Sequence, residues 1–215
     1  DAVGTATIGV NQIFNGSTDV CLTVVPQSVL PNAFNCSNIG TNTVTLNAID
    51  AVGNTSTCQA TVNVSDILPP VMSCQNITVN LNASGNATIT PAQINNNSSD
   101  NCAIKNVSVL PNTFNCANIG NNTVVLTATD ESGNTATCSA IVAVADNLPP
   151  TATCQNISID LDLTGNASIT PAQINNVSTD NCAISNLSVL PNAFTCDNIG
   201  NNTVTLTVTD TSGNT

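Results

Sequence analysis

The sequence contains no tryptophan, tyrosine, histidine or arginine, and its only lysine is Lys105. Without histidine, no serine or cysteine has the usual base that activates a nucleophile. Two carboxylates could in principle cleave a glycosidic bond, but sugar sites normally add aromatic platforms, and the chain has only four phenylalanines. We therefore expect no enzymatic activity.

Positive charge is nearly absent as well. Thirteen acidic residues stand against one basic residue, which gives a net charge of −12. Nucleic acids and anionic membranes attract clusters of lysine and arginine, so neither is expected as a partner. No apolar run approaches the ~20 residues that cross a bilayer, so we expect no membrane insertion. Cations are the partners that this charge balance allows.

The chain does contain ten cysteines, and none of them forms a Cys-x-x-Cys pair. Together with the lack of histidine, this favours disulfides over a zinc site and predicts an oxidising compartment, outside the cell or on its surface. Hydrophobic residues make up 41% of the chain, which is enough for a folded core.

A pattern returns every 80 residues. Phe34, Phe114 and Phe194 each open a Phe-x-Cys-x-Asn-Ile-Gly segment, and Pro69-Pro70 returns as Pro149-Pro150. One residue is inserted just after Cys21 in the first copy. The period predicts three repeats: 1–66 without its first strand, 67–146 complete, and 147–215 without its last strand. We expect a window of a longer array; the alternative is that another subunit donates the missing strand.

Alternation of polar and apolar residues predicts strands within each repeat. In the middle repeat these are 77–81, 87–90, 107–110, 123–129 and 135–144, with further short strands near Phe114. Gly133 lies in a loop that joins the last two as a hairpin. Short strands separated by turns predict an all-β fold of tandem Ig-like β-sandwich repeats, stapled by disulfides into an elongated array. The recurring phenylalanine is expected in each core.

The motifs follow one another in an order that resembles a known type of repeat. Asp-x-x-Pro-Pro, Asp-Asn-Cys, Phe-x-Cys-x-x-x-Gly, Asp-x-x-Gly-Asn and a final cysteine follow one another, except that Val20 replaces asparagine in the first copy. This order resembles the hyalin-repeat (HYR) type of Ig-like module found in tandem in giant surface adhesins and filaments of gliding bacteria. The resemblance implies extracellular adhesion or a stalk, with no catalytic residues.

In an Ig-like sandwich the first and last strands begin at the same end, so we expect Cys74 to pair with Cys138. Within-repeat pairing then leaves the bonds Cys102–Cys116, Cys21–Cys36 and Cys182–Cys196, with the partners of Cys58 and Cys154 outside the chain. The competing scheme joins Cys58 to Cys74 and Cys138 to Cys154 across repeats. It requires the chain to double back over Pro149-Pro150, which disfavours it.

Acidic residues recur at three places that the sandwich brings to one end of each repeat. Carboxylates, amide oxygens and backbone carbonyls suit Ca²⁺, so these places predict a structural calcium site at each repeat junction. The same residues are also ordinary turn residues, and this alternative stays open. The predicted ligands are Asp66, Asp100, Asn101 and Asp130, and Asp146, Asp180, Asn181 and Asp210.

The function predicted from the sequence is the stalk of a cell-surface adhesin, with neighbouring repeats as partners. The alternatives are a subunit of a self-assembling filament, in which other copies are partners, and a carbohydrate-binding module with an unknown surface or glycan ligand. Glycosylation is a further hypothesis, because Asn-x-Ser/Thr sequons are frequent. They include Asn76, Asn86, Asn106, Asn156, Asn166 and Asn186.

Overall fold

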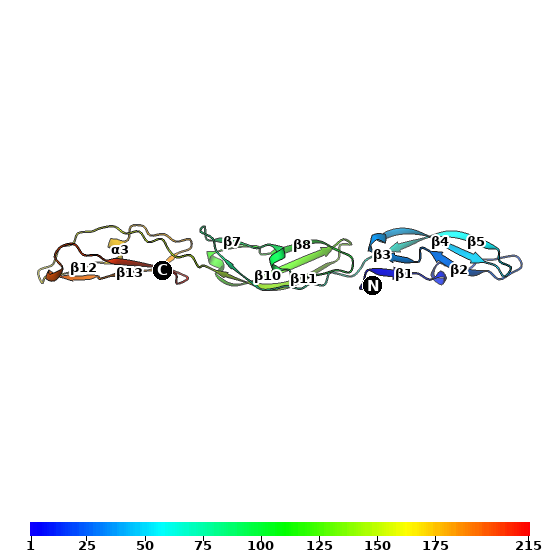
Figure 1. Ribbon diagram of the computed structural model, residues 1–215, viewed down its shortest axis with the longest axis horizontal. Coiled ribbons are helices and arrows are strands. Elements are labelled where there is room, and N and C mark those ends of the chain that lie inside the picture. The colour runs from blue at the N-terminus through cyan, green and yellow to red at the C-terminus, as the bar shows by residue number, and fades with distance from the viewer. The chain divides into compact units, whose positions relative to one another are not determined.

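The computed structural model describes residues 1–215 and shows an all-β chain (Figure 1). In repeat 1 the elements are β1 (Thr5–Thr7), α1 (Val10–Ile13), β2 (Val25–Leu30), β3 (Ala33–Asn35), η1 (Cys36–Asn38), β4 (Gly40–Ile49) and β5 (Thr55–Val64). In repeat 2 they are β6 (Ile77–Asn80), β7 (Asn86–Thr88), α2 (Pro91–Ile94), β8 (Ile104–Leu110), β9 (Thr113–Asn115), η2 (Cys116–Asn118), β10 (Gly120–Asp130) and β11 (Thr135–Ala145). In repeat 3 they are β12 (Asn166–Ser168), α3 (Pro171–Ile174), β13 (Ile184–Leu190), β14 (Ala193–Thr195), η3 (Cys196–Asn198) and β15 (Thr205–Asp210).

The middle repeat, as delimited by the sequence period, contains the six strands β6 to β11. Its main sheet has the order β6-β11-β10-β8, and β7 and β9 form a second, two-stranded sheet. The first and last strands run parallel, with Ile77 opposite Val142 and Asn80 opposite Ala145. The all-β, sandwich-like fold predicted from the sequence is confirmed, and so is the parallel direction of the first and last strands.

Two short elements are not predicted by the alternation of polar and apolar residues. A single helical turn, α2, follows Thr90, and a 3₁₀ turn, η2, follows Asn115. Asn115 Oδ1 accepts a hydrogen bond from the backbone N–H of Ala117, and the N–H of Asn115 donates to Asn118 Oδ1, which closes the turn. Such one-turn elements depend on a cap instead of an apolar stripe. No helix in the structure has the length and apolar character needed to cross a membrane.

The core of each repeat is built from branched aliphatic residues around one phenylalanine. In β10 every second side chain is buried, beginning at Val124 and Leu126, while the residues between are more exposed. This is the period of a strand with one face on a core. Phe34, Phe114 and Phe194 are 3%, 4% and 7% exposed, which confirms the predicted core role of the recurring phenylalanine.

Contacts divide the chain into two compact units, and the division falls inside the middle repeat. The first unit comprises Asp1–Cys74, Asn95–Ser108 and Leu126–Cys138; the second comprises Gln75–Ile94, Val109–Val125 and Ser139–Thr215. The first unit holds the sheets β2-β4-β5 and β1-β3, and the second holds β7-β9, β12-β14 and β13-β15. Each unit therefore contains one complete junction between consecutive repeats.

The disulfides correct most of the predicted pairing. Cys74 is bonded to Cys138, as expected. The other two bonds link neighbouring repeats, Cys36–Cys102 and Cys116–Cys182. The predicted pairs Cys102–Cys116, Cys21–Cys36 and Cys182–Cys196 are therefore wrong, and so is the competing scheme of Cys58–Cys74 and Cys138–Cys154. Cys21, Cys58, Cys154 and Cys196 are exposed free thiols.

The physical reason lies in strand β8. Its seven residues follow Cys102 and carry the chain about 23 Å, at ~3.3 Å per residue, before the turn that leads to Cys116. Bridged cysteines need α-carbons within ~7 Å of each other. Cys102 and Cys116 therefore belong to opposite ends of the repeat, and each is instead bonded to a cysteine of the adjacent repeat, with α-carbon distances of 5.4 and 5.5 Å.

Candidate metal centre and repeat junctions

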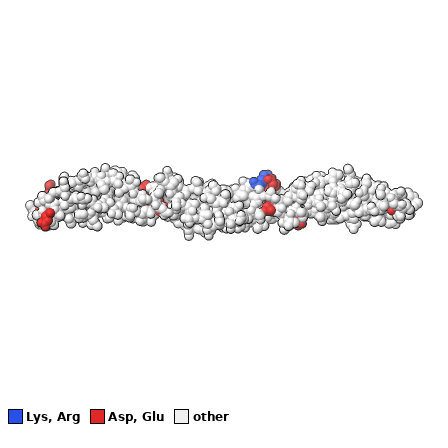
Figure 2. All heavy atoms as spheres, viewed as in Figure 1, with Lys and Arg blue, Asp and Glu red and all other residues white.

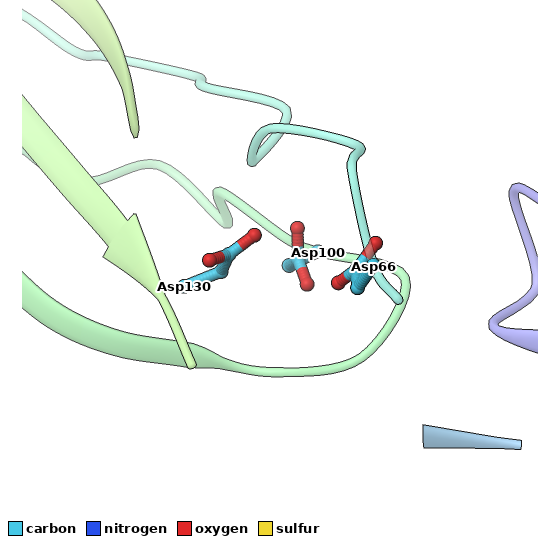
Figure 3. A group of neighbouring side chains, drawn as sticks. All are labelled: Asp66, Asp100 and Asp130. Carbon is cyan, nitrogen blue, oxygen red and sulfur yellow. The ribbon is translucent and has the colours of Figure 1, made fainter. Parts of the chain in front are cut away.

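Three aspartates converge at the start of the middle repeat. Asp66 belongs to the linker before Pro69-Pro70, Asp100 to the loop before β8, and Asp130 ends β10. Figure 3 shows their carboxylates close together, with Asp100 between Asp66 and Asp130. One carboxylate oxygen from each residue lies within 4.8 Å of the others. Loops that are far apart in the sequence thus bring three negative charges into the space of one cation.

The same arrangement occurs in the second unit. Asp146, Asp180 and Asp210 stand 80 residues after the first three, and their oxygens also lie within 4.8 Å of one another. Asp210 is 1% exposed and Asp146 is 4% exposed. The structure therefore brings together all six aspartates of the predicted sites, in two sets of the same composition.

In the first set, two carboxylate oxygens lack a partner. Asp100 Oδ1 accepts hydrogen bonds from the N–H groups of Cys102 and Ala103, at 2.9 and 3.0 Å. Asp66 Oδ1 accepts from the N–H of Leu68 at 3.2 Å. The Oδ2 atoms of Asp66 and Asp100 are buried without any hydrogen-bond partner. The local turns thus hold one oxygen of each carboxylate and leave the other oxygen free to bind a ligand.

The second set repeats this detail. Asp146 Oδ2 and Asp180 Oδ1 are buried without a partner, while Asp180 Oδ2 accepts from the N–H of Cys182 at 2.8 Å. A buried, unpaired carboxylate oxygen is costly, and three adjacent carboxylates add mutual repulsion. A bound cation removes both costs. The orphan oxygens of Asp146 and Asp180 therefore fit a metal ion and are poorly explained by turn geometry alone.

The third aspartate of each set is held in its charged form by the hairpin loop. Burial alone would raise the pKa of Asp130, but hydrogen bonds outweigh it and leave the pKa below its ordinary value. They come from Asn134, through its side-chain amide and its N–H, both at 2.8 Å, and from other N–H groups of the loop. The pKa of Asp210 is lowered in the same way by Asn214. Both carboxylates are thus available as anionic ligands at neutral pH.

No cationic side chain of the protein neutralises either set. Lys105 is the only basic residue, and its amino group lies 3.6 Å from Glu131 on the surface. Figure 2 shows this single basic group beside an acidic one, and the other charged groups on the visible face are all acidic. Within the protein, the carboxylates of the two sets thus have no basic side chain as a partner.

Asn101 and Asn181 connect the acidic sets to the preceding repeat. The side-chain amide nitrogen of Asn101 donates to Asp66 Oδ1 at 3.1 Å, and that of Asn181 donates to Asp146 Oδ1 at 3.0 Å. Asn181 also donates to the backbone oxygen of Asn82 in repeat 2, at 3.4 Å. In this arrangement the two amides position a carboxylate; their role as direct ligands stays a prediction.

The disulfide lies directly beside each acidic set. Cys102 and Cys182 are only two residues after Asp100 and Asp180. Their bonded partners Cys36 and Cys116 are the cysteines of the Phe-x-Cys motif of the preceding repeat and begin the turns η1 and η2. The pairing predicted from the sequence is different. A signal was available, because the repeated order of strand and turn puts the two cysteines of one repeat at opposite ends.

Glycine permits the close contact at each junction. Gly85 has a φ of +70°, and a β-carbon there would lie 2.6 Å from the backbone oxygen of Asn181 and 2.7 Å from Cys116 Sγ. Gly4 stands in the same position relative to Asn101 and Cys36. A side chain at this position would push the two repeats apart. The glycine, the asparagine and the disulfide of each junction are therefore packed against one another.

The low pKa of Asp130 and Asp210 predicts acid sensitivity in the absence of divalent ions. A carboxyl with a lower pKa in the folded state binds fewer protons than in the unfolded chain, so acid favours unfolding. This contribution is fully present above the ordinary value of 3.8 and is lost as the pH falls through the lower folded pKa. Urea unfolding in chelator should give a constant free energy between about pH 5 and 7 and a decline below about pH 4.

The control for this pH dependence removes the titrating groups. In a chain with Asp130→Asn and Asp210→Asn, the decline below about pH 4 should become shallower than in the unmodified chain. An unchanged decline would contradict the assignment of the acid sensitivity to these two carboxyls.

These features define a disulfide-linked, β-sandwich repeat protein with an acidic set at each junction. The family model described as HYR domain matches residues 65–144, which supports an HYR-type repeat in this segment. That range contains Asp66, Asp100 and Asp130 and all but the last two residues of the middle repeat.

Solved structures with a similar chain course are extracellular repeats of protocadherins. A two-repeat fragment (EC1-2) of human mucin-like protocadherin has 14% identity and a TM-score of 0.36, over 60% of this chain and 87% of that one. The EC1-4 fragment of PcdhgB3 has 16% identity and a TM-score of 0.35, over 82% of this chain and 52% of that one. The EC3-6 fragment of protocadherin gammaB7, described as a cis-dimer structure, has 20% identity and a TM-score of 0.32, over 80% of this chain and 54% of that one. At these values the likeness says nothing about function.

Proposed function

We propose that this chain is a non-catalytic segment of an extracellular adhesion protein, in which HYR-type repeats form a stalk and Ca²⁺ stabilises each junction between repeats. The observation that carries the proposal is the pair of matched aspartate sets, each with two buried carboxylate oxygens that have no partner. In each set the linker, the Asp-Asn-Cys loop and the hairpin loop contribute one aspartate. An ion bound there fixes the linker to the repeat that follows it.

Calcium fits this donor set better than the softer metals. All the available ligands are hard oxygens, and neither histidine nor a free cysteine belongs to the sets. Ca²⁺ accepts six to eight oxygen ligands in flexible geometry, so carboxylates from three loops can be completed by backbone oxygens and water. Mg²⁺ demands a stricter octahedron and retains its own water. We therefore expect calcium to bind more tightly than magnesium.

The extracellular location rests on the disulfides. Three bonds persist only in an oxidising environment, and two of them hold consecutive repeats together. The neighbouring repeats are thus the first partners of each repeat, and residues 1–66, 67–146 and 147–215 are the repeating units. The adhesive ligand is bound by another part of the same protein, and this segment sets the distance between that part and the cell.

Isothermal titration of the chain with Ca²⁺, after treatment with chelator, tests the ion site. We expect two ions per chain, one for each set. Asp100→Asn should reduce this number to one. Ca²⁺ at 100 times its dissociation constant should also raise the free energy of unfolding by about 2.7 kcal/mol per ion.

Asp19→Asn is the matched control. Asp19 accepts a hydrogen bond from the N–H of Cys21 just as Asp100 accepts one from Cys102, but it belongs to neither three-aspartate set. The control should still bind two ions. Equal unfolding in calcium and in chelator, or the same stoichiometry with and without Asp100, would contradict the proposal.

A further inference from the structure

The connectivity of the disulfides determines which parts of the chain can carry tension. A pull on the two ends is transmitted along the shortest covalent path. From the N-terminus this path reaches Cys36 and crosses to Cys102, follows the backbone to Cys116, and crosses again to Cys182. Residues 37–101 and 117–181 lie in side loops closed by these bonds, so tension bypasses them.

The bypassed loops contain most of each repeat. Each bond closes a sequence separation of 66, whereas the period of the repeat is 80. The segment between Cys102 and Cys116, with strands β8 and β9, is the part of one period that stays in the path. Fully extended at ~3.6 Å per residue, it reaches about 50 Å, while a complete 80-residue period without the bonds would reach about 290 Å.

We propose that the cross-repeat disulfides act as a mechanical bypass, which makes the array a tether that resists extension under load. Tension cannot draw out the long strands β10 and β11, because both lie inside a bypassed loop. Even complete rupture of the folded structure lengthens each repeat only by the small slack of the Cys102–Cys116 segment. The proposed role as a stalk gives this property its biological use, but the property itself depends on connectivity alone.

The remaining disulfide supplies an internal control. Cys74 lies inside the first bypassed loop and Cys138 inside the second. Removal of this bond therefore leaves the shortest path unchanged. Removal of Cys116–Cys182 forces the path back from Cys102 to Cys74, across to Cys138 and along the rest of the chain.

Single-molecule stretching of the complete chain between its two termini tests the bypass. The four free thiols are first alkylated under non-reducing conditions, so that they cannot exchange with the bonds. At high force the unmodified chain should reach a contour length of about 300 Å. The chain with Cys116→Ser and Cys182→Ser should be longer by about 200 Å, and the chain with Cys74→Ser and Cys138→Ser should not be longer.

Contour length at high force depends on covalent connectivity, so the result holds even where a variant is less stable. Extension of the unmodified chain to the full length of its backbone, about 770 Å, would overturn the proposal. So would an equal gain from the loss of Cys74–Cys138. The contour lengths should be the same in chelator, because the bypass depends on the disulfides and not on a bound ion. The failure of the proposed metal site would therefore not contradict the bypass.

Discussion

Replacing both Cys74 and Cys138 with serine should lower the free energy of unfolding of the middle repeat by about 4 kcal/mol. The bond closes a sequence separation of 64, and the cost of closing such a loop in the unfolded chain is the main source of its stabilisation. It also fixes β6 beside β11, where Asn76 Oδ1 accepts a hydrogen bond from the N–H of Ile141 at 2.7 Å. In a domain whose total stability is about 5–15 kcal/mol, this loss is large.

Urea unfolding followed by far-ultraviolet circular dichroism measures this effect, since the chain has no tryptophan or tyrosine to report it. Cys58→Ser with Cys154→Ser is the matched control. These cysteines occupy the corresponding positions of repeats 1 and 3, but both are free and exposed. The control should unfold like the parent chain. A loss of similar size in both variants would mean that the cysteine side chains, and not the bond, provide the stability.

Gly85→Ala should destabilise the junction between repeats 2 and 3 by about 3 kcal/mol. A positive φ costs an alanine about 1 kcal/mol, and overpacking adds about 1–3 kcal/mol. The added carbon would lie 2.6 Å from the backbone oxygen of Asn181, which cannot turn away as a flexible side chain could. The repeats must then separate, and this strains the approach of Cys116 to Cys182.

Gly165→Ala separates the effect of contact from that of conformation. Its φ of +77° is close to that of Gly85, but the only atom near its added carbon is Cys196 Sγ at 2.9 Å, with no backbone oxygen beside it. We expect a loss of about 1 kcal/mol. Alkylation and mass spectrometry provide a second measurement, since the parent chain exposes four thiols. Gly85→Ala should raise the number of reactive thiols, and an unchanged number together with equal stability losses would contradict the proposed contact.

The strands were predictable because their signal is local. The alternation from Val124 to Ala128 and the loop at Gly133 are properties of adjacent residues, and the structure has β10 and β11 where these patterns indicate them. The burial of Phe114 was predictable for a related reason, since a chain without tryptophan or tyrosine has few large side chains with which to fill a core. Helix α2 was not predictable from periodicity, because four residues contain only one turn.

The acidic sets were predictable in part. The period of 80 residues indicates that Asp66, Asp100 and Asp130 have counterparts in the next repeat, and the sandwich topology indicates that they meet at one end. The sequence could not show which carboxylate oxygens are satisfied by turns and which are left without a partner. That distinction depends on the direction of each side chain in the folded loops, and it is the observation on which the proposed ion site rests.

By itself the sequence determined an all-β, repeated, disulfide-bonded chain, because composition, alternation and period are carried by residues near one another. Only the tertiary structure decided which cysteines are joined. The partner of Cys102 depends on which end of strand β8 it occupies and on what the adjacent repeat presents there, and both are relations between residues 66 positions apart. Loops of that length close through the packing of whole strands, so the arrangement of the repeats, and no local motif, selects Cys36 as the partner.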